Sequence, residues 1–154
     1  MKSIKIWSLL AMMLIGFAGC DDIDVNGDSS SSEVTGQWGL VSWCNEVPPF
    51  NVYVEFKADG TFDMYEQVYS LTYEYVNGTY SLSNGKLTGV YSDGSQWKTS
   101  YNVSIENGDG GVKNLKLVDT ADASIVSIYG STTIPEEVKS EATATRAAGA
   151  EHFL

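Results

Sequence analysis

Apolar and polar residues alternate along most of the chain that follows residue 35. The alternation begins in residues 36–43, returns in residues 52–57 and 62–65, and is longest in residues 97–105. A period of two places successive side chains on opposite faces of an extended strand. The pattern therefore predicts half-buried β-strands rather than amphipathic helices.

Dipeptides that end in glycine separate these alternating segments. They are Asp59-Gly60, Asn84-Gly85, Asp93-Gly94 and Asn107-Gly108. Such dipeptides favour the tight turns of β-hairpins. Asn77-Gly78 lies so close to the next glycine dipeptide that we interpret it as a bulge within a strand. With that interpretation, eight strands follow one another without an intervening helix.

Short connections between consecutive strands predict an antiparallel meander. Eight such strands can close into a barrel, which removes the exposed edges of the sheet. We therefore predict an all-β fold, an eight-stranded antiparallel up-and-down barrel. Near the C-terminus, Pro135 is followed by Glu136 and Glu137, and this order favours the start of a helix. We expect one short helix over residues 135–143.

The first 20 residues differ in composition from the segments with alternation. Lys2 and Lys5 precede an apolar run, residues 6–17, which is too short to cross a bilayer that needs about 20 residues. This order is typical of a secretory signal peptide. The tetrapeptide FAGC at residues 17–20 resembles a bacterial lipobox. The resemblance implies removal of residues 1–19 and a triacylated Cys20, whose acyl chains anchor the protein to a membrane.

The acidic segment after the lipobox matches the EF-hand calcium loop at every fixed position. Those positions are Asp22, Asp24, Asn26, Gly27 and Glu33. An EF-hand loop needs a helix at each end, but here the lipobox precedes the segment and a predicted strand follows it. The acidic and serine-rich composition favours a solvated tether over residues 20–33. A calcium loop is the alternative, and we expect no metal site.

The charge and the scarcity of reactive side chains exclude several classes of function. The formal net charge is −11 at pH 7, whereas nucleic-acid affinity depends mainly on Lys and Arg. No CxxC, P-loop or G-x-S-x-G motif is present, and His152 is the single histidine. We therefore expect neither an enzyme, nor a cofactor, nor a nucleic-acid partner.

Gly36-Gln37-Trp38 lies on the first predicted strand. This G-x-W motif, the eight-strand meander and the lipobox together resemble the lipocalin-like, calycin-type domains of small lipoproteins from Bacteroidota-type bacteria. The segments FKADGTF, GTYSLSNGKLTGVYSDG and IPEEVK extend the resemblance over residues 34–141. It implies a barrel with its helix over residues 34–145 and a tail over 146–154. The calycin pattern packs a cation across the tryptophan, which implies that Gly36, Trp38 and Arg146 close one end of the barrel.

Four aromatic residues are inferred to share the inner face of this barrel. They are Tyr75, Tyr91, Trp97 and Tyr101. Their rings and hydroxyls could line a cavity for a ligand, although the interior of an eight-stranded barrel can also be filled by side chains alone.

Two functions remain open on the sequence alone. The first hypothesis is a membrane-anchored binding module for a small apolar or aromatic ligand. The alternative is a surface protein-interaction module or inhibitor that uses its acidic exterior and has a filled barrel. We expect a monomer that is exported and held in the bacterial outer membrane through lipidated Cys20. The acidic residues after that cysteine resemble a surface-export signal.

Overall fold

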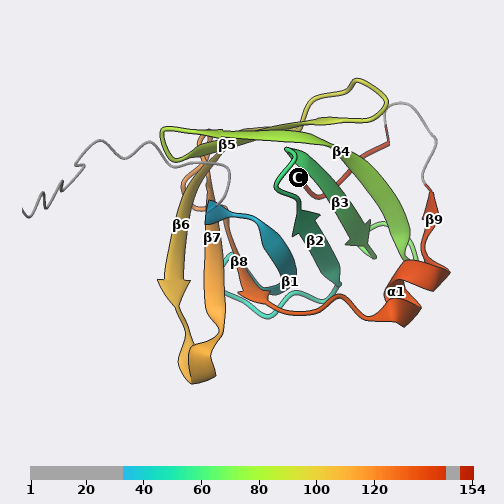
Figure 1. Ribbon diagram of the computed structural model, residues 1–154, viewed down its shortest axis with the longest axis horizontal. Coiled ribbons are helices and arrows are strands. Elements are labelled where there is room, and N and C mark those ends of the chain that lie inside the picture. The colour runs from blue at the N-terminus through green and yellow to red at the C-terminus, as the bar shows by residue number, and fades with distance from the viewer. Residues whose placement is uncertain (1–32, 145–149) are drawn as a thin grey trace, which may run out of the picture.

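Eight antiparallel strands form a closed barrel in the computed structural model, which describes residues 33–144 and 150–154 (Figure 1). The strands are β1 (Gly36–Trp43), β2 (Val52–Phe56), β3 (Thr61–Glu66), β4 (Glu74–Ser83), β5 (Lys86–Tyr91), β6 (Tyr101–Asn107), β7 (Lys113–Asp119) and β8 (Val126–Ser131). Each strand pairs with the next, and β1 pairs with β8 to close the barrel. The predicted fold class is confirmed, and the first strand has the predicted bounds.

Alternating burial along the strands follows from the alternating sequence. In β5, Leu87, Gly89 and Tyr91 are buried while the residues between them are exposed. In β2, Val52, Val54 and Phe56 are buried, and the two residues between them are half-buried. The buried side chains meet inside the barrel and form its main hydrophobic core.

Strand β4 passes through Asn77-Gly78 without a turn or a bulge. Gly78 pairs with Phe62 of β3 on one side and with Tyr91 of β5 on the other. A Cβ atom at Gly78 would overlap the carbonyl oxygen of Val90 and lie 2.9 Å from the ring of Phe62. Glycine is therefore required here because the strands approach closely, and the interpretation of this dipeptide as a bulge was wrong.

The long strand predicted over residues 97–105 was wrong at its beginning, because β6 starts only at Tyr101. The Asp93-Gly94 turn instead folds residues 95–97 back onto β5. The Tyr91 N–H donates to the Ser95 carbonyl over 2.8 Å, and the Trp97 N–H donates to the Gly89 carbonyl over 3.0 Å. Only two residue pairs then join β5 to β6. Residues 98–100 therefore leave a gap in the wall of the barrel.

The predicted helix is present as α1 (Glu136–Glu141), with Pro135 at its N-cap. Val138 of the helix and Ile134 before it are buried against Tyr65, on the outer face of the barrel. The chain then forms β9 (Thr143–Ala144), which pairs in parallel with the beginning of β4. Between β6 and β7, the three residues Asp109–Gly111 form the short 3-10 helix η2.

Several sequence predictions fall on residues 1–32 and 145–149, which lie outside the described residues. They are the signal peptide, the lipidation of Cys20, most of the segment that matches the calcium loop, and the position of Arg146. The proposed domain boundaries at residues 19, 33 and 145 also stay predictions. Within the described ranges, no helix has the length and apolar character needed to span a membrane.

Candidate ligand-binding site

Trp38 lies at the end of the barrel where β1 begins. Its side chain is 3% exposed, and its indole N–H donates a 2.8 Å hydrogen bond to the carbonyl of Val34. Gly36 has a φ of +144°, and a Cβ atom there would lie 3.7 Å from the Trp38 ring. Two of the three predicted closure residues therefore lie together at this end. The third, Arg146, is outside the described residues.

Three of the four predicted ligand-binding residues lie together inside the barrel. Tyr91, Trp97 and Tyr101 are each 6% exposed. The Trp97 ring centroid is 5.3 Å from that of Phe62 and 6.1 Å from that of Tyr101. The Tyr91 ring is 5.9 Å from Phe62. These aromatic side chains belong to the packed core, so their role as ligand contacts stays a prediction.

Tyr75 lies on the opposite face of the sheet, and its assignment to the inner face was wrong. Its hydroxyl donates a 2.7 Å hydrogen bond to Asp63, and its ring lies 5.3 Å from that of Tyr65 in the cluster beneath α1. Because β4 has no bulge, Val76 and not Tyr75 points into the barrel. A bulge would shift the parity of the residues before Gly78 by one position, and without it the alternation of β4 keeps Tyr75 outside.

Residues 150–154 enter the other end of the barrel, where β1 finishes at Trp43 and β6 begins at Tyr101. We call this the open end. His152 is 5% exposed and Leu154 is 1% exposed. Figure 1 shows this segment ending beside β2 and β3, inside the ring of strands. The sequence predicted only a C-terminal tail and did not predict that its last residues are buried.

Glu66, at the end of β3, binds this C-terminal segment. The carboxyl is 0% exposed. One oxygen lies 2.7 Å from Nδ1 of His152, and the other accepts a 2.8 Å hydrogen bond from the Phe153 N–H. The Tyr91 hydroxyl donates a 2.5 Å hydrogen bond to the carbonyl of Leu154. Burial raises the pKa of Glu66, although the hydrogen bonds from His152 and Phe153 act in the opposite direction.

Two further polar groups are buried inside the barrel. Tyr129 is fully buried, and burial first, then the neighbouring Tyr101 and Glu66, raise the pKa of its hydroxyl. Within residues 33–144 and 150–154, the Tyr129 hydroxyl and the Trp97 indole nitrogen are buried without a hydrogen-bond partner. Most buried polar groups have partners, so these two atoms represent unused hydrogen-bonding capacity.

Sequence reasoning missed Glu66 as a site residue, although a signal was present. Glu66 has the same parity as Phe62 and Met64 in β3, so alternation alone would place its carboxyl inside the barrel. A buried carboxyl needs partners. No local pattern identifies His152 as one, because 86 residues separate the two positions.

A pocket of about 350 Å³ lies at the open end of the barrel. Its wall is lined by Trp43, Phe50, Val68, Tyr69, Lys98, Thr99, Tyr101, Asp119, Ile125 and Phe153. Three of the rings pack together, with centroids 5.5 Å apart for Trp43 and Phe50 and 5.5 Å apart for Phe50 and Phe153. The pocket therefore offers mainly apolar and aromatic surface, with Lys98 and Asp119 as its charged groups.

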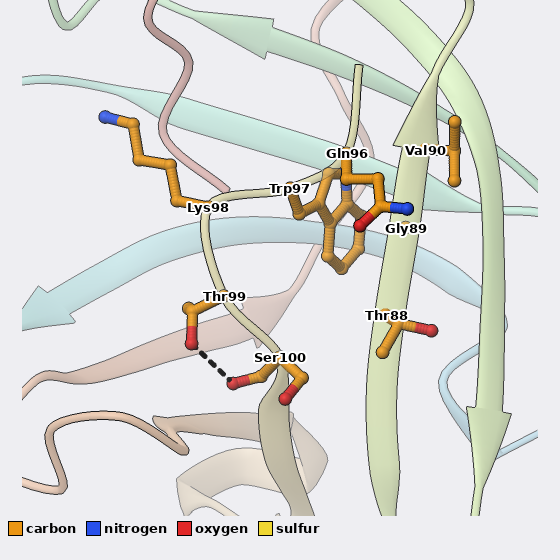
Figure 2. A pocket seen from close by; sticks show the side chains of 8 residues that line it. All are labelled: Thr88, Gly89, Val90, Gln96, Trp97, Lys98, Thr99 and Ser100. Carbon is orange, nitrogen blue, oxygen red and sulfur yellow. Dashed lines mark hydrogen bonds between the residues drawn. The ribbon is translucent and has the colours of Figure 1, made fainter. Parts of the chain in front are cut away.

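A second pocket, of about 470 Å³, opens on the side of the barrel where β5 and β6 are separated. Figure 2 shows the Trp97 indole between the strand that carries Thr88 and the segment that carries Lys98 and Ser100. Polar side chains line much of this groove. Within it, the Thr99 hydroxyl donates a 3.2 Å hydrogen bond to the Ser100 carbonyl. Because it is open and polar, this groove is less suited to an apolar ligand than the pocket at the open end.

The described residues hold no cluster of three or more His, Cys, Asp or Glu side chains that could bind a metal ion. No curated protein and no solved structure matches the chain. Residues 34–109, from just before β1 to the turn after β6, match the family model of the lipocalin-like domain, and the closed antiparallel barrel agrees with that match.

Proposed function

We propose that this protein is a binding module that takes a small, largely apolar or aromatic ligand at the open end of its barrel. The observation that supports the proposal is the pocket of about 350 Å³ ringed by aromatic side chains. Its volume falls within the range of about 300–1,000 Å³ that is usual for small-molecule sites. The match to the lipocalin-like domain agrees with binding rather than catalysis.

The lining residues indicate how such a ligand would be held. Trp43 and Phe50 offer ring faces from the β1–β2 side, and Tyr101 offers a ring and a hydroxyl from β6. Lys98 and Asp119 could orient a polar substituent. Burial of apolar surface contributes about 25 cal/mol per Å² before the cost of association is subtracted. Micromolar affinity is the expected range for a ligand of this size.

A surface protein-interaction module is the second candidate, and the rim of the open end favours it. Val47, Tyr69 and Leu71 are 87%, 57% and 95% exposed on loops at this end. Exposed apolar side chains that gather at one end can mark an interaction surface. In this alternative the aromatic interior is only a core, and the acidic exterior selects the partner.

We expect the open-end pocket to bind a neutral apolar dye such as Nile red saturably, with a dissociation constant in the micromolar range. Trp43→Ala and Tyr101→Leu should each weaken binding about fivefold or more, since each removes a large part of the apolar wall. Fluorescence titration of the purified protein measures the effect. Val112→Ala, at the other end of the barrel, is the control and should bind as wild type does. Unsaturable binding to wild type, or equal binding by both pocket variants, would contradict the proposal.

The proposed location is the bacterial outer membrane, where lipidated Cys20 would anchor the protein as a monomer of the Bacteroidota lipoprotein type. The support comes from the lipobox-like sequence and from the serine-rich tether that follows it. A tether of this composition would let the barrel stand away from the bilayer.

Cys20→Ala should move the full-length protein from the membrane fraction to the soluble fraction, because the acylated thiol is lost. Cell fractionation followed by immunoblotting measures the change, and metabolic labelling with a palmitate analogue should disappear in the same variant. Cys44→Ala is the matched control and should keep both signals. Unchanged membrane association of Cys20→Ala would refute the lipoprotein assignment.

A further inference from the structure

The C-terminal segment is held inside the barrel by the kinds of contact that a ligand would make. Glu66 accepts two hydrogen bonds from it, and Tyr91 donates one to it. Its apolar side chains pack inside the barrel: Phe153 packs on Phe50, and Leu154 lies in the main hydrophobic core. Phe153 also lines the open-end pocket, so that pocket and the segment share one lumen.

Glu66 determines which chemistry this part of the lumen accepts. A fully buried carboxyl without donors is strongly unfavourable. If the segment withdraws, the carboxyl needs a new donor-bearing partner, water, or a proton. An anionic group there would be repelled by the Glu66 charge, whereas an ammonium group would satisfy both carboxyl oxygens. The buried and unpartnered Tyr129 hydroxyl adds a donor and acceptor to the same interior.

We infer that Glu66 forms a headgroup subsite for an amine-bearing ligand with an aromatic or aliphatic body, and that His152, Phe153 and Leu154 occupy this subsite as an internal competitor. The inference rests on the proposed function and assigns a ligand class to the inner part of the same site. The imidazole and the backbone N–H stand where the amine would bind, and the Phe153 and Leu154 side chains stand where the body would lie.

Competition within one chain predicts a defined change in affinity. A ligand that needs the vacant subsite binds with its intrinsic constant divided by the fraction of vacant molecules. A segment that occupies the subsite in about 99% of molecules therefore weakens apparent binding about 100-fold. Substitutions that loosen the segment should tighten ligand binding, which is the opposite of what removal of a ligand contact does.

The test uses 1-naphthylmethylamine and 1-naphthoate, which share a ring system and carry opposite charges. Calorimetric titrations would be run on the full-length wild type and on Phe153→Ala/Leu154→Ala, which leaves Glu66 and Tyr91 intact. We expect the amine to bind the double variant at least about tenfold more tightly than wild type and more tightly than the carboxylate. Adding Glu66→Gln to the double variant should abolish the preference for the amine. Glu106→Gln, an exposed carboxylate on β6, is the matched charge control and should keep it.

Thermal unfolding of each variant ensures that folded proteins are compared. Equal amine affinity in wild type and double variant would overturn the role of the segment as a competitor. A preference for the amine that survives Glu66→Gln would overturn the headgroup subsite. If Nile red binds at the open end while either of these results is obtained, only this inference fails. If neither the dye nor the amine binds any folded variant, the proposed function fails with it.

Discussion

Replacing Trp38 with alanine should lower the free energy of unfolding by about 3–5 kcal/mol. The indole is 3% exposed and belongs to the main core, so its removal leaves a large cavity at the end of the barrel where β1 begins. It also leaves the Val34 carbonyl without the indole N–H that it accepts. Chemical denaturation followed by circular dichroism measures the loss.

Two variants separate the contributions of this tryptophan. Trp38→Phe keeps most of the apolar volume and removes the hydrogen bond to Val34, so it should cost only about 0.5–1.5 kcal/mol beyond the change in packing. Trp43→Ala truncates a tryptophan that is 37% exposed at the open end, and its effect should be clearly smaller than that of Trp38→Ala. A Trp38→Ala protein as stable as Trp43→Ala would show that the indole does not close the barrel.

Replacing His152 with alanine should lower the free energy of unfolding by about 1–3 kcal/mol at pH 7. The variant removes one of the two donors that bind the buried Glu66 carboxyl. The loss is limited because the C-terminal segment can withdraw and let water reach the carboxylate. Glu151→Ala, the exposed neighbour in the same segment, is the control and should change stability by less than about 0.5 kcal/mol.

The loss of folding stability in His152→Ala should depend on pH in a defined direction. Burial is the main cause that raises the pKa of Glu66 above its ordinary value of 4.5, and the His152 hydrogen bond partly opposes it. A carboxyl with a raised pKa binds its proton more tightly in the folded state. The stabilisation of the folded state by this proton binding is therefore fully present below pH 4.5 and is lost as the pH rises through the pKa of Glu66 in the folded protein.

Removing His152 removes a contact that lowers the pKa of Glu66. The decrease in the free energy of unfolding with rising pH should therefore be larger in the variant and extend to higher pH. We expect the stability difference from wild type to be smallest near pH 4 and to grow toward neutral pH. Glu66→Gln should remove this part of the pH dependence in both backgrounds, because the amide does not titrate. A difference that is constant from pH 4 to pH 8, or that shrinks as the pH rises, would contradict this account of Glu66.

Sequence by itself determined the number of strands in the barrel, most of their positions and the place of helix α1. These features depend on local patterns, because alternation reports which strand face is buried and glycine dipeptides report where a hairpin turns. The bounds of β1 and the helix after Pro135 follow from neighbouring residues alone. Closure of the barrel follows from the strand number and the short connections.

Only the tertiary structure decided which aromatic residues share the lumen. Tyr75 lies outside because β4 continues through Gly78, and that continuity depends on close contact with Phe62 and Val90 of neighbouring strands. Trp97 lies inside, but on a segment that folds back onto β5 rather than on β6. In both cases pairing between strands set the parity, and pairing is not encoded in the alternation of a single segment.

The candidate site most clearly separates what the sequence predicts from what only the tertiary structure decides. The inward parity of Glu66 could be read from β3, and His152 was visible as the single histidine. Their contact could not be inferred, since it joins positions 86 residues apart through the path of the chain around the barrel. The sequence determined a barrel with a carboxyl pointing inward. The tertiary structure decided that the C-terminal segment binds that carboxyl, because a buried charge must be paired by whichever donors the closed fold brings to it.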